Sequence, residues 1–229
     1  MGAQLRVYRR RMRSVKATKK ITKAMELISA SRIVKAQQRV AASTPYANEL
    51  TRAVSAVATY SSTNHPLTTA SERPIRAAIL IISADRGMAG AYSNNAIKEG
   101  EQLAALLRER GLEVKPYLVG RKAVGYYKFR DRQIAGQWTG FSDNPTYEHA
   151  KEVADALIQA FLADAQTDVH GVDEIHIVFT KFRSMLTQEA TAKRMIPLEV
   201  VESDEAPVSG VLPEYEFEPS AGEVLDALL

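Results

Sequence analysis

Cysteine is absent from the 229 residues, which excludes a disulfide scaffold, a cysteine-ligated zinc site and a thiol nucleophile. No apolar run approaches the roughly 18 residues that a membrane-spanning helix needs. The arginine-rich start, residues 1–13, has no apolar segment of the kind found in secretory signals. With 45% hydrophobic and 25% charged residues, the composition is that of a globular protein. We therefore expect a soluble, folded chain made in a reducing compartment.

Acidic residues are scarce at the N-terminus. Residues 1–60 contain 13 Lys and Arg but only two acids, Glu26 and Glu49, and so carry a net charge of +11. The remainder has a net charge of −8, and residues 195–229 hold nine acids and no base. This asymmetry indicates that the N-terminal part of the chain binds an anionic partner.

Glycine and proline are also absent from residues 3–44, which are rich in good helix formers. A helix of that length is about 63 Å long, whereas a compact domain of this size is about 45 Å across. The helix is therefore expected to project from the rest of the chain.

An irregular apolar heptad supports a helical partner for this segment. Leu5, Tyr8, Met12 and Val15 occupy its a and d positions, the pattern shifts near Ile21, and alanine and serine allow a partner helix to approach closely. Residues 1–60 do not themselves supply that partner.

Beyond Pro45, where we expect the helix to bend or restart, strands alternate with helices. This alternation predicts an α/β layered sheet. The expected strands are 75–83, 113–119, 133–139, 174–180 and 184–201, and the expected helices are 46–61, 95–110, 121–127 and 147–165. Ser220 and Glu223 then form the pattern of a capping box, which begins a C-terminal helix.

Motifs for catalysis are missing. The chain has no GxxxxGK[ST], GxGxxG, HExxH or GxSxG motif. The segment Asp85–Gly90 follows a buried strand and precedes a helix, where α/β folds bind phosphates, but its two glycines equally suit a plain turn, which we favour. The histidines are scattered, and His176 is expected on a strand, facing a helix or solvent.

The basic N-terminus allows three interpretations. A solvated helix face would not need so large an excess of bases. A nucleic-acid-binding arm fits the charge, yet only Tyr8 could stack on a base and the apolar positions would have no use. A shaft inside an acidic protein collar accounts for the length, the small residues and the charge together, so this interpretation is favoured.

Three stretches resemble the gamma subunit of F-type ATP synthases. Residues 10–26 (RRMRSVKATKKITKAME) contain the Ile-Thr-Lys-Ala-Met hallmark of that family. Residues 83–92 (SADRGMAGAY) are similar to its Ser-Asp-Arg-Gly segment, and residues 215–219 (YEFEP) with 224–229 (VLDALL) look like its approach to the C-terminal helix. The resemblance covers essentially the whole chain in order.

The resemblance implies a Rossmann-like α/β domain with a long projecting N-terminal helix that forms half of an antiparallel coiled coil. It implies a non-catalytic rotary shaft, without a cofactor, that couples proton flow to ATP synthesis or hydrolysis. The implied partners are the alpha and beta subunits, the epsilon subunit and the membrane c-ring, at the cytoplasmic face of a bacterial plasma membrane, with no span of its own and no nucleic acid. The implied contacts are Arg9, Arg10, Arg13, Lys19, Lys20, Lys23 and Met25 for the alpha–beta hexamer, and Tyr215, Phe217 and Glu218 for the epsilon subunit and the ring.

The expected boundaries are a helical shaft at 1–62, a globular foot at 63–219 and the start of the C-terminal helix at 220–229. The family's long C-terminal helix is not present, so we expect a fragment. The polar stretch Asp164–Asp173 is longer than usual for the family, and the cysteine pair of chloroplast relatives has no counterpart. A basic-armed nucleic-acid-binding α/β protein is the alternative, and a small α/β enzyme using residues 85–90 is a more distant one.

Overall fold

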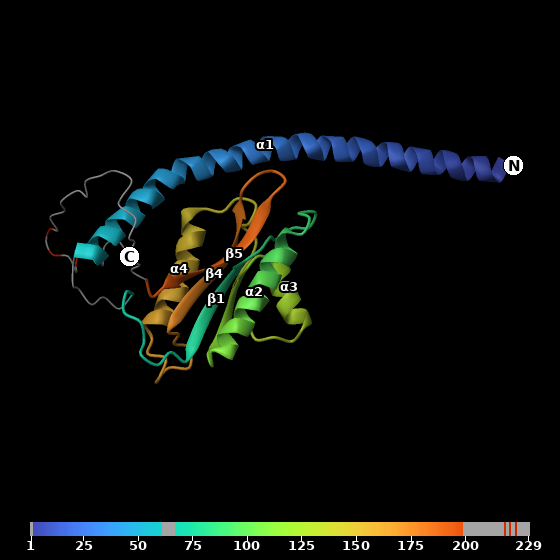
Figure 1. The fold of residues 1–229 in the computed structure, drawn as a ribbon. Helices are drawn as coiled ribbons and strands as arrows, with labels where there is room; N and C mark the ends of the chain where they lie inside the picture. Colours follow the sequence, from blue (N-terminus) through green and yellow to red (C-terminus); the bar gives the residue numbers. More distant parts are fainter. Residues whose placement is uncertain (1, 61–66, 199–217, 219, 221–222, 224–229) are drawn as a thin grey trace. The chain divides into compact units, whose positions relative to one another are not determined.

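The computed structural model describes residues 2–60, 67–198, 218, 220 and 223. They fall into two compact units, the first reaching to Val57 and the second beginning at Ala58. The second unit contains a single five-stranded sheet with helices on both faces (Figure 1). The predicted α/β fold class is confirmed.

Helix α1 extends without interruption from Gly2 to Tyr60, over 59 residues (Figure 1). Of the two outcomes expected at Pro45, a bend or a restart, the restart was wrong, because the helix continues through this residue. Proline has no N–H group, so the carbonyl of Ala41 loses its usual partner. One residue earlier, the Thr44 hydroxyl donates to the carbonyl of Val40 at 2.6 Å.

The strands lie in the order β3-β2-β1-β4-β5. Strands β1 to β4 are parallel to their neighbours, and β5 pairs antiparallel with β4. Their bounds are Arg76–Ile82 (β1), Glu113–Val119 (β2), Gly136–Trp138 (β3), Glu174–Phe182 (β4) and Gln188–Ile196 (β5). The parallel strands therefore end at one edge of the sheet, called here the carboxyl edge.

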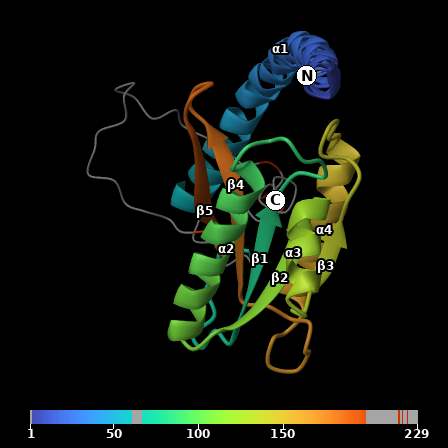
Figure 2. The same ribbon diagram turned by 90° about the vertical axis from the view of Figure 1, so that its right-hand side faces the viewer.

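Helices α2 (Tyr92–Glu109) and α3 (Arg121–Phe129) cover one face of the sheet, and α4 (Tyr147–Leu162) covers the other (Figures 1 and 2). Alternation along β1 explains both layers, since successive side chains point to opposite faces. Ile79 and Ile81 pack in the cluster beneath α2 and α3. Leu80 packs with Leu157 in the cluster beneath α4.

All the strands and helices predicted between residues 75 and 201 are present, but several bounds differ. The last strand is shorter than 184–201, because the Ser184 hydroxyl accepts hydrogen bonds from the Leu186 and Thr187 N–H groups and forms a turn. Residues 199–201 lie outside the described part. The edge strand β3 has three residues instead of the seven expected.

The polar stretch Asp164–Asp173 is anchored at the amino edge of the sheet by Arg76. The guanidinium of Arg76 donates to the carbonyls of Ala165, Asp168 and Gly171 at 2.7–3.1 Å. The Asp173 carboxylate accepts from the backbone N–H groups at the start of β1. The Nε of Arg76 also forms an ion pair with the Glu113 carboxylate at 2.9 Å. Arg76 therefore links the backbone of this loop to β2.

His176, expected to face a helix or solvent, is buried beside two charged residues. Its Nε2 lies 2.8 Å from the Glu174 carboxylate, which also accepts from Arg110 at 2.8 Å. The hydrogen bond with His176 lowers the pKa of Glu174 to about 2; burial acts in the opposite direction and Arg110 supports the lowering. The carboxylate is therefore ionised and paired at neutral pH.

Gly120 is predicted to be irreplaceable at the junction of β2 and α3. Its φ is +93°, and a Cβ atom would lie 2.4 Å from the carbonyl oxygen of Ser83. We expect Gly120→Ala to lower the free energy of unfolding by roughly 3 kcal/mol or more. Gly111 is the matched control: its φ is +87° but nothing lies within 4 Å of its Cβ position, so Gly111→Ala should lower it by about 1 kcal/mol. Equal losses in urea denaturation would contradict this explanation.

The Glu174 pair predicts a defined pH dependence. A carboxyl group whose pKa is depressed on folding stabilises the protein fully above its unfolded value of 4.5, and this contribution disappears as the pH falls toward 2. Glu174→Gln should lower the free energy of unfolding by about 2 kcal/mol at pH 7, and the difference from wild type should narrow between pH 4.5 and 2. A difference that is constant with pH in urea denaturation would exclude the ionised pair as its cause.

Candidate functional site: the basic stripe of α1 and the carboxyl-edge cavity

Six basic residues of α1 follow one another at alternating intervals of three and four. This spacing keeps them on one side of a helix of 3.6 residues per turn. All six are exposed. We call this set the basic stripe; it consists of Arg6, Arg9, Arg13, Lys16, Lys20 and Lys23.

The predicted contact residues for the hexamer do not all share that side. Arg9, Arg13, Lys20 and Lys23 are members of the basic stripe, and Arg10 and Lys19 flank it. Met25 follows Lys20 by five residues, which at about 100° per residue places it roughly 140° away around the helix. The sequence prediction omitted Arg6 and Lys16, although their spacing could have revealed them.

The basic stripe is almost free of acidic partners among the described residues. Lys23 pairs with Glu26 at 3.2 Å, with both side chains about two-thirds exposed; such a pair is worth at most about 1 kcal/mol. No other acid lies on the first 48 residues. The charge of the stripe is therefore available to an anionic surface.

Apolar side chains run beside the basic stripe and are also exposed. Leu5, Tyr8, Met12 and Val15, the predicted heptad positions, are between 54% and 68% exposed. Ile21, where the pattern shifts, is 62% exposed and lies about 120° around the helix from Val15. Exposed apolar side chains in a row are typical of a surface that a partner covers.

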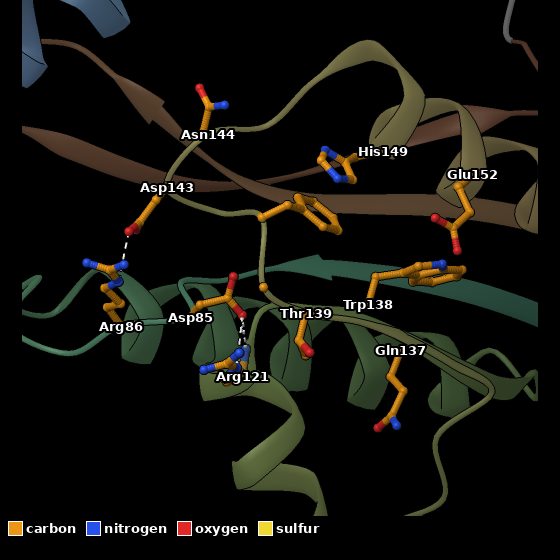
Figure 3. A pocket seen from close by; sticks show the side chains of 12 residues that line it. Asp85, Arg86, Arg121, Gln137, Trp138, Thr139, Asp143, Asn144, His149 and Glu152 are labelled. Atoms are coloured by element: carbon orange, nitrogen blue, oxygen red, sulfur yellow. Dashed lines mark hydrogen bonds and ion pairs between the residues drawn. The ribbon is translucent and has the colours of Figure 1, made fainter.

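A cavity of about 680 Å³ lies at the carboxyl edge of β1, β2 and β3 (Figure 3). Its walls include Trp138 and the parallel rings of Phe141 and His149, whose centroids are 4.4 Å apart. Arg86 on its rim pairs with Asp143 at 2.8 Å. The cavity includes the beginning of the segment Asp85–Gly90, for which a plain turn was favoured over a ligand site.

Asp85 lies at the edge of this cavity, and hydrogen bonds from the backbone fix its side chain there. Its carboxylate accepts hydrogen bonds from the N–H groups of Arg121 at 3.0 Å and Ser142 at 2.9 Å. Burial raises the pKa of Asp85, but hydrogen bonds from the backbone of Ser142, Gly140 and Arg121 outweigh it and bring the pKa to about 2. A carboxylate that is ionised and saturated in this way is a poor general base.

The histidines of the described part belong to separate local structures. His149 receives the Thr146 N–H at its Nδ1 and completes the cap of α4. His170 is exposed in the polar loop, and His176 belongs to the buried pair with Glu174. Within the described ranges, no three His, Asp or Glu residues are placed to hold a metal ion.

The predicted foot contacts fall mostly outside the described residues. Tyr215 and Phe217 lie there, whereas Glu218 is described and exposed. One hydrogen bond of the predicted capping box is present, because the Ser220 hydroxyl accepts from the Glu223 N–H at 3.3 Å. The hydroxyl also donates to the Glu223 carboxylate at 3.3 Å. Among the helices that the structure describes, none is long and apolar enough to cross a membrane.

Comparison with known sequences gives a match over almost the whole chain. A sequence profile described as ATP synthase matches residues 4–229. The chain is 64% identical over 229 residues to the ATP synthase gamma chain of Acidothermus cellulolyticus and 60% identical over 230 residues to that of Clavibacter sepedonicus. Each alignment covers all of this chain and 76% of the relative.

Solved structures with a similar fold come from more distant organisms. The central stalk and c-ring structure of the Tetrahymena thermophila mitochondrial ATP synthase matches with a TM-score of 0.60 at 16% identity, over 90% of this chain and 84% of that one. The rotor of the Euglena gracilis enzyme matches with a TM-score of 0.56 at 15% identity, over 93% and 73%. At these identities the likeness bears on the fold alone.

Proposed function

We propose, because the chain belongs to the family of ATP synthase gamma chains, that it is the central rotary shaft of a bacterial F-type ATP synthase. In this role it couples proton flow through the membrane ring to ATP synthesis or hydrolysis in the hexamer of alpha and beta subunits. The shaft transmits torque and has no catalytic role of its own.

The observation that carries this proposal is the continuous, exposed helix α1 with its basic stripe. At about 1.5 Å per residue, its 59 residues extend roughly 88 Å. The helix satisfies most of its own backbone hydrogen bonds. Its large apolar side chains between Leu5 and Tyr46 are mostly exposed, whereas Ala56 and Val57 near its end are buried. A partner helix covers the apolar side, and the stripe faces acidic loops of the surrounding subunits.

The chemistry of the stripe suits a surface that must slide. Lys and Arg on long side chains attract acidic groups over several ångströms, and each exposed pair is worth about 0.2–1 kcal/mol. Such contacts are exchanged one at a time without a large barrier. Deeply interlocking apolar side chains would instead hold the shaft at one angle.

The remaining assignments follow the same proposal. Arg10, Lys19 and Met25 contact the hexamer from either side of the stripe, and the foot contacts the epsilon subunit and the c-ring through Tyr215, Phe217 and Glu218. The domain boundaries are near residues 62 and 219. The protein lies at the cytoplasmic face of the plasma membrane as a peripheral part of the complex, and it needs no cofactor.

Nucleic-acid binding is the alternative that the positive charge of the stripe favours. The exposed row of Leu5, Met12 and Val15 argues against it, because a phosphate backbone offers these side chains no apolar surface. Two results together would favour nucleic-acid binding over the shaft function. The protein would be retained on DNA with an affinity that falls steeply with salt, and it would not associate with alpha and beta subunits.

The basic stripe should matter more for coupling than an equal charge elsewhere on α1. We expect Arg13→Gln, Lys16→Gln and Lys20→Gln, combined in the complete synthase, to lower proton pumping per ATP hydrolysed several-fold in membrane vesicles. The matched control removes three exposed charges from another side of the helix, with Arg32→Gln, Lys35→Gln and Arg39→Gln. Equal coupling in the two variants, with assembly intact, would exclude the stripe as the surface that faces the hexamer.

A further inference from the structure

The amino end of α3 is the place where an α/β fold usually binds an anion. Its first N–H groups point toward the carboxyl edge of the sheet, and the helix dipole favours negative charge there. It follows a parallel strand, as in nucleotide-binding folds. Whether this position can take a ligand depends on which acceptors those N–H groups already have.

All the first four N–H groups of α3 are occupied within the chain. Lys122 donates to the carbonyl of Ala84 at 3.1 Å, and Ala123 donates to the Ser83 hydroxyl at 3.0 Å. Val124 already donates within its own helix, to Gly120. The remaining group, the N–H of Arg121, donates to Asp85.

Asp85 therefore lies where a ligand's oxyanion would lie. One carboxylate oxygen accepts from Arg121 and the other from the N–H of Ser142, 57 residues further along the chain. The Asp85 N–H in turn donates to the Ser142 hydroxyl at 2.8 Å. The side chain is only 7% exposed, and the Arg121 guanidinium lies at 4.0 Å (Figure 3).

We propose that Asp85 is a positioning residue whose carboxylate fills the fold's own oxyanion site, thereby closing the site to phosphate ligands and locking three segments together. The segments are the loop after β1, the start of α3 and the loop after β3. The site lies outside the surfaces assigned to the shaft function, so this inference can be tested separately from that function.

The proposal requires that the donors stay in place when the carboxylate is removed. Asp85→Gly leaves a space of the size of a small carboxylate, lined by the N–H groups of Arg121 and Ser142. Formate, which carries the same group on one carbon, is the matching probe. A residue that only fills space would not be replaced by a dissolved anion.

The first experiment measures melting temperatures of the full chain in sodium formate and in sodium chloride of equal concentration. Asp85→Gly should melt below wild type, and formate should restore at least half of the loss. Formate should leave wild type unchanged, because its site is full. The control is Leu157→Ala, which removes a buried side chain from the cluster beneath α4 without opening an anion site.

Equal stabilisation of Leu157→Ala and Asp85→Gly by formate would overturn the proposal, because the effect would then be a general one of the salt. Failure of formate to stabilise a folded Asp85→Gly variant would overturn it as well. A second variant covers the case in which Asp85→Gly does not fold.

Asp85→Asn keeps the shape of the side chain and removes its charge. The groups that face the site are Arg121, the Arg86–Asp143 pair, and His149 and Glu152 on α4, all of which remain in both proteins.

Because the pKa of Asp85 is lowered from 3.8 to about 2, its charge stabilises the fold above pH 3.8 and this effect is lost as the pH falls toward 2. The melting-temperature gap between wild type and Asp85→Asn should therefore be constant above pH 5 and close toward pH 2. The absence of a gap at pH 7, or a gap that persists at pH 2, would contradict the proposal.

Discussion

A single α-helix satisfies its own backbone hydrogen bonds but cannot bury its own side chains, and α1 must meet this constraint over 59 residues. Its apolar row and its basic stripe lie side by side and are both exposed. Burying the apolar row takes an apolar surface of a partner, and neutralising the stripe takes an anionic one. The length, charge and composition of the helix all follow from its being part of a larger assembly.

The α/β unit differs from α1, because several of its charged side chains find their hydrogen-bond partners within the same unit. Asp85 occupies the position of a ligand anion, Arg76 anchors the polar loop at the amino edge, and Glu174 and His176 pair within the fold. The hydrogen bonds of Asp85 and Arg76 link segments that are distant in the sequence, which suits a part that transmits force.

Local patterns allowed the fold to be predicted well. The apolar run of β1 and the periodicity of α4 are encoded by neighbouring residues, and the structure contains both. The bond from the Glu223 N–H to the Ser220 hydroxyl, one half of the predicted capping box, is also present. Contacts between distant residues were not predictable in this way. The bonds of Asp85 to residues 36 and 57 positions away depend on the order of the strands, and so does the burial of His176. The contact residues on α1 were predicted from a family resemblance, and only their spacing reveals that Met25 lies apart from the stripe.

The central claim is that this chain turns inside a hexamer. Because residues 1–229 contain no cysteine, Phe129→Cys introduces the one attachment point among them, at a side chain that is 90% exposed. A gold particle attached there, in the protein assembled with immobilised, cysteine-free alpha and beta subunits, can be followed under dark-field illumination as ATP is added. The account predicts stepwise rotation in one direction, at a rate that rises with the ATP concentration. A particle that stays still while the same complexes hydrolyse ATP would contradict it.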